Sequence, residues 1–384
     1  DDLVRDPKST IEFDERAQAA SEARVDRLGG DGRLLVDGDG DIVVVTLLEK
    51  LLVPALAKLS NFVPGGGIWM NTQRPEWNDA NNALVGNGLS MVTLFHLRRY
   101  LLHLRSLVDE HGQDTSVSFE VVSWFDSVRE ILASAPVTTG PEADHRRRDL
   151  MDRLGRAASE HRSAISCSGL SGSVRVSGAD SIVELCDVAI GHLDETIRGS
   201  SRTDGLVQSY NILHCPTSET ATVAPLAEML EGQVAALSSA GLSARRQADL
   251  LDALFASDLY REDLGTFMLA PPRRPPAFLD KNVIDPGVVH NNAVLSRLLD
   301  ADDRTVIRTD PDGTYRFAPD ITTAPMLKAR LDHLRRAAPW DSLVADELDA
   351  VLEVYELVFA HRAYIGRSGS MYAFEGIGSI YWHM

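Results

Sequence analysis

Residues 65–90 read GGGIWMNTQRPEWNDANNALVGNGLS, the most unusual stretch of the chain. It holds too much glycine and too many polar residues for a core element, and too many tryptophans and asparagines for an ordinary linker. A long apolar pattern with helical spacing begins directly after it, near Ser90. In such an arrangement the loop carries chemistry and the buried helix holds the loop in place. The stretch is therefore the first candidate for a functional site.

The side chains of this stretch suit a sugar ligand. Sugars present flat apolar faces and a ring of hydroxyls, so Trp69 and Trp77 can stack on the faces. Glu76 and Asp79 supply carboxyl groups, which cleavage of a glycosidic bond needs as proton donor or base. Side-chain amides that can donate to and accept from hydroxyls stand at Asn71, Gln73, Asn78, Asn81 and Asn82. The same composition also fits a polar turn that only caps the following helix.

Two segments resemble one enzyme family. Glu76-Trp77-Asn78-Asp79-Ala80-Asn81, followed by Val85-Gly86, resembles the motif DWNDGMN-x-VG of the cellobiose and chitobiose phosphorylases. Near the other end, Gly366-Arg367-Ser368-Gly369 and Gly378-Ser379-Ile380-Tyr381-Trp382 resemble the GRGG and TGSA-x-W segments of that family, in the same order. The chain departs from the motifs at Glu76, Ala80 and Ile377, where the family has Asp, Gly and Thr.

The resemblance implies an (α/α)6 barrel and cleavage of a glycosidic bond with inversion, with Asp79 as the general acid. Inverting hydrolysis needs a second carboxylate to activate water. Glu375 is the candidate base, and Tyr372 in the same loop is a candidate substrate contact. In the alternative, inorganic phosphate is the co-substrate, held by Arg367, Gly378 and Ser379. Because Ile377 removes a hydroxyl and Glu375 would repel phosphate, hydrolysis is the first prediction and phosphorolysis the second.

A third interpretation is a sugar-binding or scaffold module that keeps the helices but has lost catalysis. Binding of oligosaccharides without any product would distinguish it from both enzymes. A helical-repeat protein without a sugar function would not need the sequence WNDANN at residues 77–82.

The composition is that of an ordinary globular protein. The chain has 384 residues, 44% hydrophobic and 24% charged, which allows one large or two medium domains. With 38 Lys and Arg against 56 Asp and Glu, the net charge of −18 argues against nucleic acid or an anionic membrane as a partner. We expect an oligosaccharide or polysaccharide substrate and no cofactor or metal ion, and we leave a homodimer open.

The cysteines indicate a reducing compartment. Cys167, Cys186 and Cys215 show no metal-binding spacing, and their odd number argues against a disulfide framework. We expect them to be reduced and mostly buried in a cytoplasmic protein. No run reaches the roughly 18 apolar residues of a transmembrane helix, and no signal peptide is visible. Because the chain starts at Asp1 and ends in an aromatic run, we expect a fragment of a longer protein.

Helical periodicity dominates the rest of the chain. Met91 to Val108 is apolar over most of its circumference, which is typical of a helix buried between neighbours. His96, Arg99 and His103 share a narrow stripe of this helix that fits a solvated face. Further helices are predicted at 10–28, 47–59, 116–135, 141–166, 178–198, 222–240, 243–256, 288–300, 324–337 and 341–364.

Strand signals are minor. They predict hairpins at 33–45 and 305–317 and a strand at 171–176. Asp37, Asp39 and Asp41 begin like a calcium loop, but Ile42 and Leu48 stand where that loop needs glycine and glutamate.

We therefore predict an all-α fold, an α/α toroid of the six-hairpin glycosidase type with minor β-hairpins. Its domains are a linker helix at 1–30 and a catalytic domain at 31–384. Loops at one end of such a barrel form the cleft, so other polar loops are candidates for hydroxyl contacts, or else plain connectors. They offer Gln208, Tyr210, Asn211 and Asn282.

Overall fold

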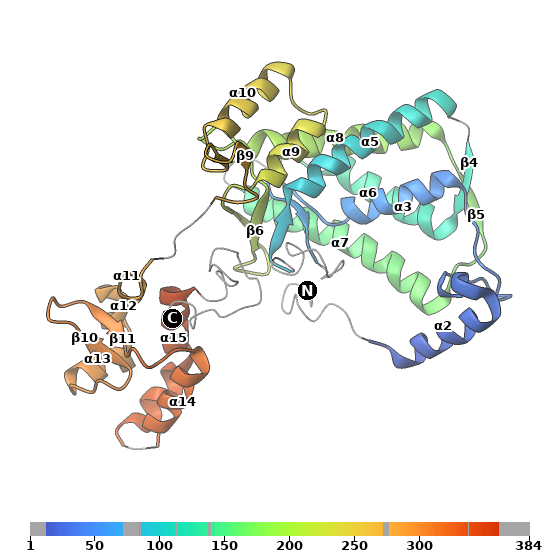
Figure 1. Cartoon of the computed structure of the whole chain (residues 1–384). Coiled ribbons are helices and arrows are strands. Elements are labelled where there is room, and N and C mark those ends of the chain that lie inside the picture. The colour runs from blue at the N-terminus through green and yellow to red at the C-terminus, as the bar shows by residue number, and fades with distance from the viewer. Residues whose placement is uncertain are drawn as a thin grey trace. The chain divides into compact units, whose positions relative to one another are not determined.

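The computed structural model describes residues 13–71, 84, 86–112, 114–136, 140, 142–271, 276–336 and 338–360. They form two compact units, one with the described residues up to 71 and from 86 to 271, the other with those from 276 onward (Figure 1). Each unit has its own hydrophobic core. Helices predominate and the sheets are small, so the mostly helical class with minor β-hairpins is confirmed. The sequence did not predict the division near 271, and closure into a toroid stays a prediction.

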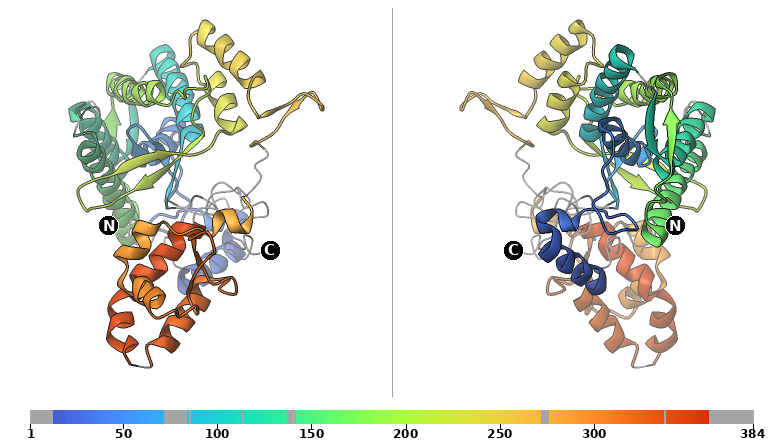
Figure 2. Two further views of the ribbon diagram at one scale, coloured as in Figure 1. Left: turned by 90° about the vertical axis from the view of Figure 1, so that its left-hand side faces the viewer. Right: turned by 90° about the vertical axis from the view of Figure 1, so that its right-hand side faces the viewer.

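The first unit is built around one long helix, α5. Its N-terminus is capped by Ser90, whose Oγ accepts a hydrogen bond from the Thr93 amide (2.9 Å). The buried residues Leu94, Leu101, Leu104 and Val108 follow helical spacing, and α5 packs against α3, α8 and α9. Figure 2 shows this group of helices from two further sides. The helices of the unit are α2 (Glu15–Leu28), α3 (Leu47–Leu59), α5 (Met91–His111), α6 (Phe119–Ser134), α7 (Ala143–Ser168), α8 (Ala179–Gly199), α9 (Leu230–Ser238) and α10 (Ala244–Phe255), with the 3-10 helix η1 (Gly29–Arg33) after α2.

A five-stranded antiparallel sheet accompanies these helices. Its spatial order is β1-β2-β3-β6-β7, from β1 (Phe62–Val63), β2 (Gly67–Trp69), β3 (Gly88–Ser90), β6 (Tyr210–His214) and β7 (Thr222–Pro225). Met151 of α7 packs on it within a small cluster of Val63, Leu89, Leu213 and Ala221. Arg147 also ties α7 to the sheet region, since its Nε donates to the Pro64 carbonyl (2.7 Å) and its Nη1 to the Ala221 carbonyl (2.6 Å).

Several local predictions need correction. Residues 222–225, predicted as the start of a helix, pair with β6 as strand β7, and the helix begins only at Leu230. The predicted hairpin at 33–45 is reduced to one bridge, between Val36 and Ile42. Its turn is held by the Asp37 carboxylate, which accepts from the amides of Asp39 and Asp41 at 3.0 Å each. Of the aspartates that begin like a calcium loop, Asp37 thus has a structural role in this turn.

Two short ribbons complete the first unit. The predicted strand near 171–176 is present as β5 (Val174–Ser177), paired with β4 (Thr115–Ser118). The second ribbon joins β8 (Tyr260–Arg261) to β9 (Thr266–Phe267).

The second unit packs small helices and a hairpin around an aromatic core. Tyr355 contacts Phe317 and Phe359, with ring centroids 5.1 and 4.7 Å apart. The predicted helix 288–300 is divided at Asn292, whose side chain accepts from the Leu295 amide and so caps a new helix. The predicted hairpin at 305–317 is confirmed. The elements are α11 (Phe278–Lys281), α12 (Pro286–Asn291), α13 (Ala293–Asp300), β10 (Ile307–Thr309), β11 (Tyr315–Phe317), α14 (Ala324–Leu334) and α15 (Trp340–Phe359).

Candidate functional site

The predicted motif lies on the connection between two paired strands. β2 pairs antiparallel with β3, with Trp69 opposite Leu89, and the chain between them carries the WNDANN sequence. Many predicted site residues lie outside the part of the chain that the structure describes, and their roles stay predictions. They are Gln73, Glu76, Trp77, Asn78, Asp79, Asn81 and Asn82 in this connection, and Arg367, Tyr372, Glu375, Gly378 and Ser379 near the C-terminus.

The described residues at the base of this connection hold its two ends together. The Met70 amide donates to the Gly88 carbonyl (2.9 Å), and the Gly86 amide donates to the Met70 carbonyl (2.6 Å). The Trp69 indole Nε1 also donates to the Gly86 carbonyl (2.8 Å). Gly86 has φ +80°, a left-handed conformation that costs a residue with a Cβ about 1–2 kcal/mol. The backbone conformation at this position therefore explains the glycine of the resembled motif.

A second contact fixes the end at Asn71. Its Nδ2 donates to the Asn61 Oδ1 (2.7 Å), and the Asn61 Nδ2 donates to the Ala57 carbonyl in the last turn of α3 (2.8 Å). The Asn61 carbonyl also accepts from the Trp69 amide (2.8 Å). The end of the connection is thereby tied to a helix whose other face lies in the core. Nothing in the residue pattern marked Asn61, which follows the helix as an ordinary polar residue.

Trp69 and Asn71 are thus placed in the scaffold. The Trp69 ring is partly buried against the cluster that contains Val63, Leu89 and Met151, and its N–H group is engaged by Gly86. The predicted stacking of Trp69 on a sugar stays a prediction, but the described contacts explain this tryptophan without a ligand.

Tyr210 and Asn211 belong to strand β6. Tyr210 is 5% exposed, and its hydroxyl donates to the Glu231 carboxylate. Burial, and then the hydrogen bond to Glu231 and its charge, raise the pKa of the Tyr210 hydroxyl. The Asn211 Nδ2 donates to the Gly66 carbonyl (2.7 Å). Both side chains are engaged within the protein.

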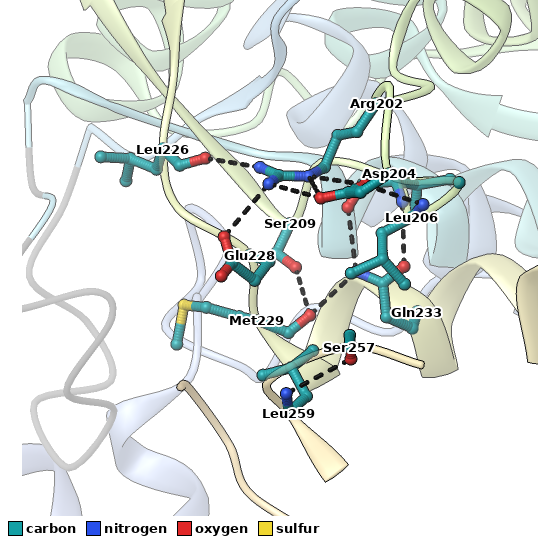
Figure 3. A network of polar contacts seen from close by, with 12 residues as sticks. Arg202, Asp204, Leu206, Ser209, Leu226, Glu228, Met229, Gln233, Ser257 and Leu259 are labelled. Atoms are coloured by element: carbon teal, nitrogen blue, oxygen red, sulfur yellow. Dashed lines mark hydrogen bonds and ion pairs between the residues drawn. The ribbon is translucent and has the colours of Figure 1, made fainter. Parts of the chain in front are cut away.

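The loop before β6 is fixed by a network of polar contacts (Figure 3). The Arg202 guanidinium contacts Asp204 (2.7 Å) and Glu228 (3.1 Å) and lowers the pKa of the Asp204 carboxyl, mainly through their hydrogen bond. The fully buried Gln233 side chain accepts from the Val207 amide and donates to the Val207 and Met229 carbonyls, each at 2.9 Å. The loop is therefore a rigid connector.

Gln208 stands out within this loop. Its amide donates to the Ser200 carbonyl (3.0 Å), whereas its side-chain Oε1 is buried and has no hydrogen-bond partner among the described residues. An unsatisfied buried acceptor costs about 1–3 kcal/mol, so Gln208 remains a candidate for contact with a ligand or water.

The strand register shows where Tyr210 lies relative to the motif connection, the chain between β2 and β3 that carries the WNDANN sequence. On β3, Gly88 lies opposite Ile212 and Ser90 lies opposite Tyr210. The connection leaves at the Gly88 end, and Tyr210 lies at the Ser90 end. At about 3.3 Å per residue, the two positions are roughly 7 Å apart along the strand. The structure thus brings the base of the connection and Tyr210 onto one small sheet, at opposite ends of a short strand.

The other candidates have structural roles or solvated positions. In the second unit, Asn282 is 1% exposed, and its side chain bonds to both the amide and the carbonyl of Phe317. His96, Arg99 and His103 are exposed, as a solvated face requires.

The three cysteines are free, but only Cys186 is buried, while Cys167 is exposed and Cys215 is intermediate. The expectation that they are mostly buried is wrong, because α7 carries Cys167 on its polar C-terminal half.

Two kinds of feature are absent from the described residues. They contain no group of three or more His, Cys, Asp or Glu side chains arranged to hold a metal ion. In the same residues, no helix combines the length and apolar character needed to cross a membrane.

Comparison with known proteins gives an informative match in the second unit. A search of curated proteins finds no match to this chain. Residues 275–362 match the family described as GH149 phosphorylase insertion domain 2. The matched range begins close to the start of the second unit and ends close to its last described residue. This match supports a relationship between the chain and the glycoside phosphorylases, and with it a carbohydrate-active enzyme.

Proposed function

We propose that this chain is part of an inverting glycoside phosphorylase. The observation that carries the proposal is the match of residues 275–362 to an insertion domain of the GH149 phosphorylases. The resemblance of residues 76–86 to a phosphorylase motif supports it independently, because it involves a different part of the chain. The sequence alone favoured hydrolysis over phosphorolysis, and because of the match we now put phosphorolysis first.

In this mechanism a phosphate oxygen attacks the anomeric carbon from the face opposite the glycosidic oxygen. The bond between the anomeric carbon and the leaving oxygen breaks as the new bond to phosphate forms, so the configuration inverts. Asp79 donates its proton to the leaving oxygen, which gives a sugar 1-phosphate and a shortened saccharide. The (α/α)6 arrangement of the catalytic helices belongs to the same proposal.

The roles of the two carboxylates separate phosphorolysis from hydrolysis. Phosphate replaces both the attacking water and the carboxylate that would activate it, so phosphorolysis needs Asp79 but no base at Glu375. Arg367 and Ser379 are the proposed phosphate contacts, since a guanidinium and a hydroxyl both donate to phosphate oxygens. The proposed substrate contacts remain Trp77, Asn78, Asn81 and Asn82.

Substitution of each carboxylate tests the proposal. We expect Asp79→Asn to lower the rate of sugar 1-phosphate formation by about 10²-fold or more, in line with loss of a general acid. Glu375→Gln should retain activity within about tenfold. Circular dichroism of both variants controls for folding. A folded Asp79→Asn protein with near-normal turnover would contradict the acid assignment, and loss of all cleavage in Glu375→Gln would favour hydrolysis.

A further inference from the structure

The ribbon of β4 and β5 in the first unit has an exposed apolar edge. Among the described strands β5 pairs with β4 alone, so its other edge lacks a paired strand there (Figure 1). On β5 the side chains of Val174 and Val176 are 65% and 61% exposed. They lie two residues apart and therefore on the same face of the strand. Such an exposed edge of β-branched residues is a ready partner for another strand.

A second unpaired segment lies between the bridge at Ile42 and helix α3. Its residues 43–46 belong to no helix or strand, and the backbone of Thr46 is extended. No described residue accepts a hydrogen bond from the amide of Val44 or Val45, and the Val44 side chain is 89% exposed. A run of exposed valines with free backbone amides is suited to strand pairing.

The segment and the ribbon lie on neighbouring parts of the surface. The Ser118 amide, at the end of β4, donates to the Glu49 Oε2 in the first turn of α3 (3.0 Å), and Ser118 lies opposite Val174 in the ribbon. Residues 43–46 lead directly into this turn of α3. Within one chain, however, Val44 and Val174 both remain exposed, so the segment does not cover the edge of its own ribbon.

The charges beside the segment and the edge are complementary. Asp39 and Asp41 are exposed and directly precede the segment. Arg175, in the middle of β5, contacts Asp126 but is itself exposed. Because a guanidinium carries five N–H donors, Arg175 can bind a second carboxylate as well. An acidic turn followed by an extended valine run therefore matches a valine edge with an arginine at its centre.

We propose that residues 43–46 of a second copy of this chain add as a third strand to the free edge of β5, with the same exchange in the opposite direction. Because each copy carries both the segment and the edge, the two contacts close a dimer with two-fold symmetry. Val44 then packs beside Val174 and Val176, as β-branched side chains on neighbouring strands do. The inference does not depend on the proposed function, because assembly is measured without activity.

Lysine substitutions on the segment and on the edge test this interface. The wild-type protein, with its net charge of −18, is sedimented at about 0.15 M salt, where repulsion is screened beyond about 8 Å, and should show a monomer–dimer equilibrium. We expect Val44→Lys and Val176→Lys each to raise the dimer Kd at least about tenfold, because lysine at a strand edge opposes pairing and each substitution occurs twice in the dimer. Val234→Lys, at an exposed valine of α9, is the matched control and should keep the wild-type Kd.

Two results of sedimentation would overturn the inference. One is a wild-type protein that stays monomeric at every concentration tested. The other is a dimer whose Kd is unchanged in both folded lysine variants, because its interface would then lie elsewhere. Circular dichroism of each variant controls for folding.

Disulfide trapping identifies the partner of the segment and does not need the lysine variants. The double variant Val44→Cys/Val176→Cys is oxidised in a Cys167→Ser background, which removes the exposed native thiol, and is then separated on a non-reducing gel. Since the Cβ atoms of paired strands come within reach of a disulfide, the exchange predicts a covalent dimer. Val234→Cys in place of Val44→Cys should give none. A cross-link confined to single chains would place the segment on its own ribbon and overturn the second copy as its partner.

Discussion

At several positions around the motif connection, backbone geometry and close packing explain the residue type as well as chemistry does. A Cβ at Gly66 would lie 2.4 Å from the Leu89 Cδ1, so a larger residue in the turn between β1 and β2 would displace this buried side chain. Glycine is favoured at residue 86 by the positive φ of that position. The glycines at residues 65–67 thus belong to a tight turn between two paired strands, in which the Gly66 amide donates to the Val63 carbonyl (3.0 Å).

The cysteines give a test of burial at this scale. Burial, and then the charge of Asp187, raise the pKa of the Cys186 thiol from 9.0 to about 12, so its thiolate fraction at pH 8 is about 10⁻⁴. We expect iodoacetamide at pH 8 to modify the exposed Cys167 in the native protein, and Cys186 only after unfolding. The folded state holds the Cys186 proton more tightly than the unfolded state does. The free energy of unfolding therefore falls as pH rises from 9.0 toward 12. Peptide mass spectrometry measures the rates, and modification of native Cys186 as fast as Cys167 would contradict its burial.

At the scale of elements, the sequence predicted long helices well and short strands poorly. α3 and α5 each have an apolar face that repeats over several turns, so their bounds were predicted within a few residues. Strands β2 and β3 have three residues each, too few for an alternating pattern. Their pairing depends on partners distant in sequence, such as β6. The strands at the base of the candidate site could therefore not be predicted from the sequence, although the motif itself could be recognised.

The polar loop before β6 offers a test at this scale. Because the hydrogen bond from Arg202 lowers the pKa of Asp204, the carboxylate stabilises the folded state above its unfolded pKa near 3.8, and this contribution is lost as pH falls through the lower folded value. With 41% of the Asp204 side chain exposed, we expect Asp204→Asn to lower the free energy of unfolding by at most about 1 kcal/mol at pH 7. The difference should shrink toward pH 3. Urea denaturation at both pH values measures it, with Asp258→Asn, at an exposed position, as control. A difference that grows on acidification would contradict the ion pair.

At the scale of the whole molecule, the chain contains two cores where the sequence predicted one catalytic domain. Residues 271–276 read PPRRPP, a stretch that fits a loop within one domain as well as a linker between two, so the contacts are needed to reveal the division. The second core contains Tyr355, Phe359 and Phe317 and lies within the range that matches the phosphorylase insertion domain. Whether the first unit belongs to an (α/α)6 barrel stays part of the proposed function.

The second unit should fold on its own. Its core includes fully buried Leu298, Leu331 and Tyr355, so we expect a fragment of residues 272–384 to unfold in one cooperative thermal transition. Tyr355→Ala should destabilise the fragment by about 3–5 kcal/mol, as expected for removal of a large buried ring. Exposed Leu357, in the same helix, gives the matched control Leu357→Ala, which should change stability by less than about 0.5 kcal/mol. A fragment without a cooperative transition would show that this core needs the rest of the chain.

The most direct test of the central claim is the dependence of saccharide cleavage on phosphate. The native protein is incubated with a panel of oligosaccharides, with and without inorganic phosphate, and both sugar 1-phosphate and free sugar are quantified. Phosphorolysis predicts sugar 1-phosphate as the product and no cleavage when phosphate is absent. Release of free sugar at the same rate in phosphate-free buffer would contradict this account and establish hydrolysis instead.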